Sequence, residues 1–196
     1  NIAAMKSHGV KTVVTSCPAC WLVWHTYYPQ WAEKLGIEYG IEARHYSEVI
    51  TEQIAAGKLP VPAELKAKVT FHDSCHLGRA GKIYDAPRNL LKAIPGVELV
   101  EMEHNREQSM CCGSVLTRIG EPKPTSDNLG AMRVQEAVDA GAEAMVAICP
   151  CCEFQLRVSA NNAGINMPVK DLAALTAKAL GYEYPDPTGY VYEIWT

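Results

Sequence analysis

Short runs of β-branched and apolar residues alternate along the chain with longer stretches whose apolar residues recur at helical spacing. The short runs have the composition of buried strands, and the longer stretches that of helices packed by one face. The predicted strands span residues 11–16, 37–45, 68–72, 97–102 and 144–148. The predicted helices span residues 18–35, 47–56 with Ser47 as N-cap, 86–93, 129–140, 150–159 and 170–180. This alternation predicts an α/β fold with mainly parallel strands.

One segment of the sequence occurs twice. Gly9–Cys20 aligns with Gly141–Cys152, because the glycines, the apolar runs and the two Cys-Pro-x-Cys units coincide. A predicted helix follows each copy. Such a repeat indicates two similar modules, whose Cys-x-x-Cys turns should lie at equivalent strand-to-helix junctions.

The repeat and a proline-containing stretch divide the chain into parts. Residues 1–57 are expected to be the C-terminal part of a first module, whose earlier part would precede Asn1, and residues 58–67 a linker. Residues 68–196 are expected to hold a complete second module. The fold prediction is therefore two tandem, pseudo-symmetric α/β modules, the first of them incomplete in this chain.

Composition and charge argue against several classes of protein. The chain of 196 residues is 48% hydrophobic and 20% charged, which is ordinary for a globular protein with a buried core. Its net charge of −4 gives no reason to expect a nucleic-acid partner. No apolar run approaches the roughly 20 residues of a membrane-spanning helix, and no export signal opens the sequence. These features predict a cytoplasmic protein.

The cysteines of the chain are clustered. The eight occupy positions 17, 20, 75, 111, 112, 149, 151 and 152. A secreted disulfide scaffold is the simplest interpretation, but such scaffolds are usually short and poor in core, unlike this chain. Clustered cysteines in a cytosolic protein more often bind metal or carry out redox chemistry, because thiolates are soft ligands for zinc, copper(I) and iron–sulfur clusters.

Five cysteines of the second module follow the order C…CCG…CxxC. Cys149 and Cys152 stand where a predicted strand turns into a helix, and the N–H groups and dipole of a helix N-terminus favour an anion. Cys111 and Cys112 can reach one site only from a turn, for which Gly113 supplies backbone freedom without a Cβ to block the site. Four thiolates suffice for a cubane [4Fe–4S] cluster or a tetrahedral zinc ion. A fifth indicates a bridging thiolate, an opened cluster or a spare reactive thiol.

The sequences HDSCHLGR, CCG and CPCC around these cysteines resemble the cysteine-rich CCG domain. This domain occurs, usually as a tandem pair, in heterodisulfide reductase catalytic subunits and in the iron–sulfur subunits of glycolate and lactate oxidases. The runs CCGSVLT and CPCCEFQLR look most like the heterodisulfide-reductase-like iron–sulfur subunit of sulfate reducers' membrane redox complexes. The resemblance implies a non-cubane [4Fe–4S] cluster, at which the reductases cleave a disulfide. The ligands that it implies here are Cys75, Cys111, Cys112, Cys149 and Cys152.

Four further residues are secondary candidates. Cys17 and Cys20 match the last two ligands of a first module, so a second [4Fe–4S] cluster is conceivable, with its other ligands upstream of this chain. His72 and His76 flank Cys75 and are candidates for tuning the cluster or for relaying a proton to a departing thiol. The alternative for both histidines is a structural role as hydrogen-bonded residues in the wall of the site.

The leading functional prediction is reductive cleavage of a disulfide or trisulfide, with electrons supplied by partner subunits. The expected partners are an iron–sulfur or cytochrome membrane subunit and a small thiol/disulfide or thiol-bearing protein substrate. Such partners would hold an otherwise cytoplasmic chain at the periphery of a membrane. The alternative is an electron-transfer subunit of a glycolate- or lactate-type oxidase. A third hypothesis, of a different class, is a structural zinc domain.

Overall fold

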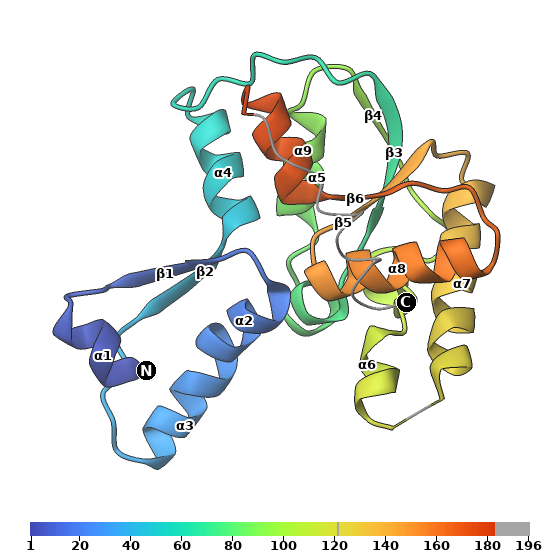
Figure 1. Cartoon of the computed structure of the whole chain (residues 1–196). Coiled ribbons are helices and arrows are strands. Elements are labelled where there is room, and N and C mark those ends of the chain that lie inside the picture. The colour runs from blue at the N-terminus through green and yellow to red at the C-terminus, as the bar shows by residue number, and fades with distance from the viewer. Residues whose placement is uncertain (121, 183–196) are drawn as a thin grey trace.

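The computed structural model describes residues 1–120 and 122–182 and contains two sheets (Figure 1). The larger sheet has the strand order β4-β3-β5-β6, and the smaller sheet pairs β1 with β2. All of these strand pairs are parallel, which confirms the predicted α/β class. The strands are β1 (Thr12–Thr15), β2 (Glu42–His45), β3 (Ala67–His72), β4 (Val97–Val100), β5 (Ala144–Ala147) and β6 (Val169–Asp171).

Helices connect these strands. The α-helices are α1 (Ile2–Ser7), α2 (Pro18–Leu22), α3 (Tyr28–Lys34), α4 (Tyr46–Ala55), α5 (Asp85–Lys92), α6 (Ser114–Arg118), α7 (Lys123–Asp139), α8 (Pro150–Asn162) and α9 (Leu172–Ala179). The described residues also form three other helical turns. Two are π-helical, η1 (Val23–Tyr27) and η2 (Cys75–Ala80), and one is a 3₁₀ turn, η3 (Arg106–Gln108). Within the described part of the chain, no helix combines the length and apolarity needed to cross a membrane.

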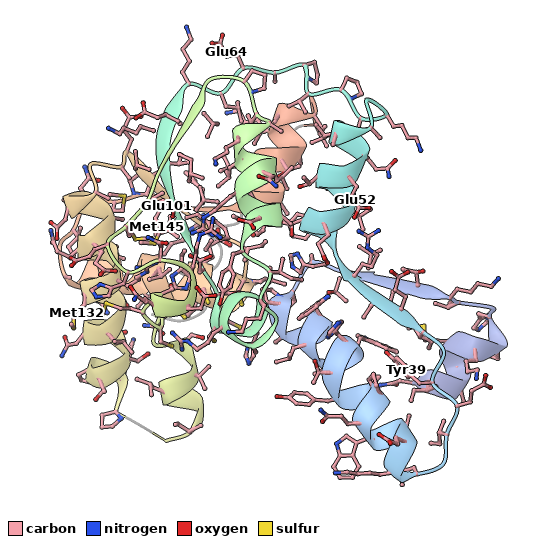
Figure 2. All side chains as sticks on the ribbon, turned by 180° about the vertical axis from the view of Figure 1, so that it is seen from behind. Tyr39, Glu52, Glu64, Glu101, Met132 and Met145 are labelled. Atoms are coloured by element: carbon pink, nitrogen blue, oxygen red, sulfur yellow. The ribbon has the colours of Figure 1, made fainter. Side chains whose placement is uncertain are left out.

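The larger sheet lies between two helical layers. Helices α7 and α8 pack on one face, and α5 and α9 pack on the other, with α4 beside α5 (Figure 1). Successive residues of β5 face opposite layers, so that Met145 contacts the α7–α8 core and Val146 the α5–α9 core. Figure 2 places Met145 inside the molecule and Met132 on the outer side of α7, and their exposed fractions are 0% and 58%. Burial on both faces explains why β5 is an unbroken apolar run in the sequence.

The helix predicted over residues 18–35 is not continuous α-helix. The turn η1 separates α2 from α3, and Pro29 lies in the first turn of α3. Proline has no N–H to donate, and its ring crowds the carbonyl of the residue four positions earlier. A π turn immediately before the proline relieves this conflict while the chain keeps its helical direction.

The prediction was wrong about the start of β2 and of the helix after it. Gly40 adopts a φ of +60°, outside the extended region, and the strand begins only at Glu42. The N-cap of α4 is His45, not Ser47. The His45 ring accepts a hydrogen bond from the Ser47 N–H, and the Glu48 carboxylate accepts one from the His45 N–H, which completes a capping box.

Residues from both predicted modules pack into one core. Trp21 and Tyr46 belong to the same buried cluster as Phe71 and Leu77, and Trp21 is 2% exposed. A Cβ atom built on Gly81 would lie 2.4 Å from the Trp21 ring, so α2 can approach the end of η2 this closely only because that residue is glycine. The predicted division of the chain at residues 58–67 stays a prediction.

A topological switch point lies between β3 and β5. From β3 the chain crosses to β4 on one side of the sheet, and it later returns to β5 on the other side. In open parallel sheets, this arrangement leaves a crevice at the carboxyl ends of the strands, where ligands bind. The segments that follow β3, β4 and β5 carry Cys75, the Cys111–Cys112 pair and Cys149.

Candidate metal centre

The cysteine sulfurs at these strand ends form one connected set. Cys111 is hydrogen-bonded to the side chains of Cys75 and Cys112. The Sγ atoms of Cys112 and Cys152 are 3.2 Å apart, and Cys152 is hydrogen-bonded in turn to Cys149. All five are free cysteines. The structure therefore brings together the five residues that the resemblance implied as ligands.

The connected set extends to Cys17, which hydrogen-bonds to Cys149. Cys17 is the N-cap of α2, with φ −104° and ψ 123°, and Cys149 is the N-cap of α8, with φ −115° and ψ 124°. A proline follows each cysteine at the start of its helix. This confirms that the two Cys-x-x-Cys turns lie at equivalent strand-to-helix junctions.

Hydrogen bonds from neighbouring thiols favour the thiolate form at two sulfurs of the set, Cys111 and Cys149. Hydrogen bonds from Cys112 and then Cys75 lower the pKa of Cys111 to about 2, and the bond from Cys152 is the main reason that the pKa of Cys149 is lowered to about 2. Bonding to Cys111 conversely raises the pKa of Cys75 well above its usual value and that of Cys112 to about 11. Because metals bind thiolates, the set already favours the ligating form at two of its positions.

The CCG turn depends on the conformation of Gly113. This residue has a φ of +91°, and its N–H donates to the Cys111 sulfur at 3.4 Å. A Cβ atom on Gly113 would lie 2.4 Å from the carbonyl oxygen of Ser126 on α7. The positive φ confirms the predicted backbone freedom, and the atom that a side chain would strike belongs to the α7 backbone rather than to the cysteine set.

His72, the last residue of β3, is buried beside two of the cysteines. A ring nitrogen of His72 and the Sγ atoms of Cys112 and Cys152 lie within 4.8 Å of one another. His72 Nδ1 accepts a hydrogen bond from Arg133 Nε at 3.2 Å. Burial, and then the positive charge of Arg133, lower the pKa of His72 to about 3, so that the ring is neutral at pH 7.

Three other residues considered in the sequence analysis, His76, Cys20 and Cys151, are not part of the connected set of sulfurs described above. His76 follows Cys75 in η2 and is partly buried. Cys20 is exposed on α2. Cys151 is partly buried against the core between α7 and α8.

Two arginines are buried beside the residues that lead to Cys75, and sequence reasoning missed one of them, Arg133. Arg88 donates to both carboxylate oxygens of Asp73, at 2.7 and 2.8 Å, and also to Glu101. Arg133 is fully buried and pairs with Glu136. Charged residues on helices are normally assigned to the surface. One signal was available, because Arg133 shares the apolar face of α7 that its neighbours at helical spacing form.

Comparison with known proteins also points to the part of the chain that carries the five cysteines. Residues 69–157 match the family described as CCG, the cysteine-rich domain. The chain is 34% identical over 184 residues to one of the subunits of the dihydromethanophenazine:CoB–CoM heterodisulfide reductase of Methanosarcina mazei. It is 36% identical over 154 residues to a probable iron-sulfur-binding oxidoreductase, FadF, of Bacillus subtilis. It is 32% identical over 189 residues to the EtfAB:quinone oxidoreductase of Syntrophomonas wolfei.

These matches cover 93%, 78% and 92% of the chain, but only 44%, 21% and 26% of the respective relatives. The chain thus spans less than half the length of each of them. The segment that matches the domain family runs from β3 into α8 and contains all five second-module cysteines. The part of the chain that holds the cysteine set, residues 69–157, is therefore similar to the cysteine-rich CCG domain.

Proposed function

We propose that this chain is an iron–sulfur redox subunit that holds one non-cubane [4Fe–4S] cluster. Its ligands are Cys75, Cys111, Cys112, Cys149 and Cys152. The observation that carries the proposal is the single connected set of five sulfurs at the switch point of the sheet.

The donor set fits such a group. All five donors are sulfurs, the soft ligands that suit iron–sulfur clusters, and three of the five are buried. The set holds one more cysteine sulfur than a cubane cluster or a tetrahedral zinc ion uses as ligands. Hydrogen bonds lower the pKa of two of the sulfurs, and the helix N-terminus at Cys149 favours the negative charge of a bound cluster.

The reaction that we propose is reductive cleavage of a disulfide or trisulfide. When bound, the cluster would supply electrons one at a time and a Lewis-acidic iron for a sulfur ligand. The protein contributes an asymmetric enclosure, in which Cys112, Cys149 and Cys152 are buried while Cys75 and Cys111 are partly exposed. A sulfur substrate would therefore approach from the side of Cys75 and Cys111. His76, partly buried next to Cys75, is the residue that we propose gives a proton to a thiolate that leaves on this side.

The electrons would come from partner subunits of a redox complex, an iron–sulfur or cytochrome subunit of a membrane among them. The chain would then lie in the cytoplasm, or peripherally on a membrane through those partners. A homologous protein of Chromohalobacter salexigens, 32% identical over 185 residues, is named a probable membrane-anchored ferredoxin. If Cys17 and Cys20 serve a second [4Fe–4S] cluster, that cluster would adjoin the first, since the Cys17 side chain is hydrogen-bonded to Cys149.

The second candidate function is electron transfer alone, as in the iron–sulfur subunit of a glycolate- or lactate-type oxidase. This second function is supported by the similarity to oxidoreductases that are not named as heterodisulfide reductases, such as the EtfAB:quinone oxidoreductase. In that function the cluster would pass electrons between partners, and no thiol substrate would reach Cys75 and Cys111.

Metal analysis and electron paramagnetic resonance test the proposal together. Anaerobically purified protein should contain about four irons for the second module, and added thiols should change the spectrum of the oxidised cluster. Stoichiometric zinc without iron would contradict the cluster and favour a structural zinc domain. A spectrum that no thiol or thiol-bearing protein alters would favour electron transfer alone.

A further inference from the structure

A fully buried arginine links the two segments that present Cys75 and Cys112. Arg133 Nη2 donates to Ser109 Oγ at 3.1 Å, and Ser109 Oγ donates to the carbonyl oxygen of Asp73 at 3.1 Å. Arg133 Nη1 donates to the carbonyl oxygen of His104 and to Glu136. The Nε–H donates to His72, so all three nitrogens of the guanidinium donate hydrogen bonds. Arg133 is fully buried, so these bonds are shielded from water.

The bond from Arg133 determines which nitrogen of His72 carries the ring proton. A guanidinium has no lone pair to offer and acts only as a donor, so Nδ1 must be the acceptor. In a neutral imidazole one nitrogen accepts and the other carries the proton. The proton of His72 is therefore on Nε2, the nitrogen that does not contact Arg133.

This tautomer argues against His72 as a metal ligand. Ligation through Nε2 needs a lone pair there, which would move the proton to Nδ1 and set it against the Nε–H of Arg133. Ligation through Nδ1 would displace Arg133. The ring nevertheless lies close to the two cysteines, because one of its nitrogens is within 4.8 Å of the Sγ atoms of Cys112 and Cys152.

We propose that His72 donates the hydrogen bond of its Nε2–H to a sulfur at the Cys112–Cys152 side of the cluster, and that Arg133 is the positioning residue that fixes this tautomer. The inference rests on the proposed cluster. No proton is transferred. A bond from N–H to sulfur stabilises the more negative, reduced form of a cluster and so raises its reduction potential.

Two substitutions of His72 test the hydrogen bond. His72→Leu keeps a buried apolar side chain but removes the donor. At a fixed potential we expect the ratio of reduced to oxidised cluster to fall about tenfold, which is about 59 mV for a one-electron step. His72→Gln keeps an acceptor for Arg133 and a donor for sulfur, and should restore most of the potential. The proton of the bond should also appear in pulsed electron paramagnetic resonance as an exchangeable coupling, present in the wild type and absent in His72→Leu.

A control on the same network is His104→Leu. The His104 ring contacts Glu136 and is 45% exposed, so this variant disturbs the surroundings of Arg133 without removing a group near the sulfurs. Its potential should stay at the wild-type value. If His72→Leu, with full iron content, keeps the wild-type potential and the exchangeable coupling, the hydrogen bond is refuted while the cluster stands.

The tautomer can be measured without any metal. In iron-free protein labelled with ¹⁵N-histidine, the nitrogen shifts of His72 should identify Nε2 as protonated and Nδ1 as an acceptor. A proton on Nδ1 would overturn the inference. If the wild type bound no iron, the proposed function would fail, and this measurement would still decide the role of Arg133. If both His72 variants lost iron, the same spectrum would decide the inference.

Discussion

Neighbouring cysteines of the CPCC run have different surroundings. Cys152 is 4% exposed and its sulfur lies 3.2 Å from that of Cys112, whereas Cys151 is partly buried against the core between α7 and α8. In the internal repeat, Ala19 stands at the position of Cys151, between Cys17 and Cys20. The turn therefore does not require a sulfur at its third position. A small side chain that packs against the helices is sufficient there.

Alanine substitutions should separate these two cysteines. Cys151→Ala should keep full iron and sulfide content and cost little stability, because it replaces one small side chain by another. Cys152→Ala should lose or convert the cluster, because metal binding and folding are coupled at such sites. Iron and sulfide are measured in both variants, prepared side by side without oxygen. Loss of iron from Cys151→Ala with retention in Cys152→Ala would refute the ligand assignment.

The difference between Cys152 and Arg133 shows what the sequence could reveal about the site. Cysteine spacing identified which sulfurs come together, because few other side chains suit a soft metal and their order is specific. Arg133 could not be identified in this way, since an arginine on a helix is usually solvated and its partners Ser109 and His72 are distant in sequence. Its burial depends on the tertiary structure.

Acid should destabilise the metal-free chain partly through His45. Burial lowers the pKa of His45 to about 4, whereas an unfolded histidine titrates near 6.5. Between these values the unfolded chain binds more protons, so stability rises with pH there. The contribution of His45 is complete above pH 6.5 and is lost as the pH falls toward 4, by about 3 kcal/mol in all.

His45→Asn is the matched variant for this effect. Asparagine also accepts the N-cap hydrogen bond of α4, but it does not titrate. Urea unfolding of both metal-free proteins at pH 7 and at pH 4.5 should give a smaller loss of stability for the variant. Equal losses in the two proteins would show that His45 is not held neutral by the fold.

At the scale of elements, sequence periodicity predicted most of the strands and the long helices, but it did not predict several of the shortest elements. Strands β3 and β5 and helix α8 begin within a residue of their predicted starts, because apolar runs bounded by turns specify them. Helix α7 begins at Lys123, six residues before its predicted start, because its first turns are polar and contain Pro124, which is tolerated at that end. Elements as short as α6 and β6 contain too few residues to establish a period.

The CCG turn offers a matched pair of glycines on either side of α6. Gly113 and Gly120 both have a φ of +91°, but among the described residues a Cβ on Gly120 meets no atom within 4 Å, whereas one on Gly113 meets Ser126. Gly120→Ala should therefore cost only the backbone strain, about 1–2 kcal/mol. Gly113→Ala should cost more and reduce the iron content, because the turn must move away from α7. Comparable unfolding midpoints for the two variants would mean that the contact with Ser126 does not add to the cost of a side chain at position 113.

At the scale of the whole molecule, Trp21 is one of the residues that join the smaller sheet to the rest. A two-stranded sheet is only marginally stable by itself. All residues of β1 and β2 except His45 are exposed or partly exposed. Trp21 enters the core that contains Phe71 and Leu77, close to Gly81. The same helix, α2, carries Cys17 to Cys149. The internal repeat predicted two equivalent turns, but it did not predict that they would meet, because that depends on this packing.

Trp21→Ala should uncouple the two parts, and Trp31→Ala provides the control. Trp21 is 2% exposed, so its removal should cost about 3–5 kcal/mol and leave a cavity against Gly81. Trp31 is 59% exposed and contacts only Lys34 among the described ring interactions, so its loss should be nearly neutral. Hydrogen exchange measures the effect by region. In Trp21→Ala the amides of β1 and β2 should exchange much faster, while those of β3 and β5 keep most of their protection. A uniform rise across both sheets would instead mean that the chain unfolds as one cooperative unit, and that Cys17 stays beside Cys149 for as long as the protein is folded.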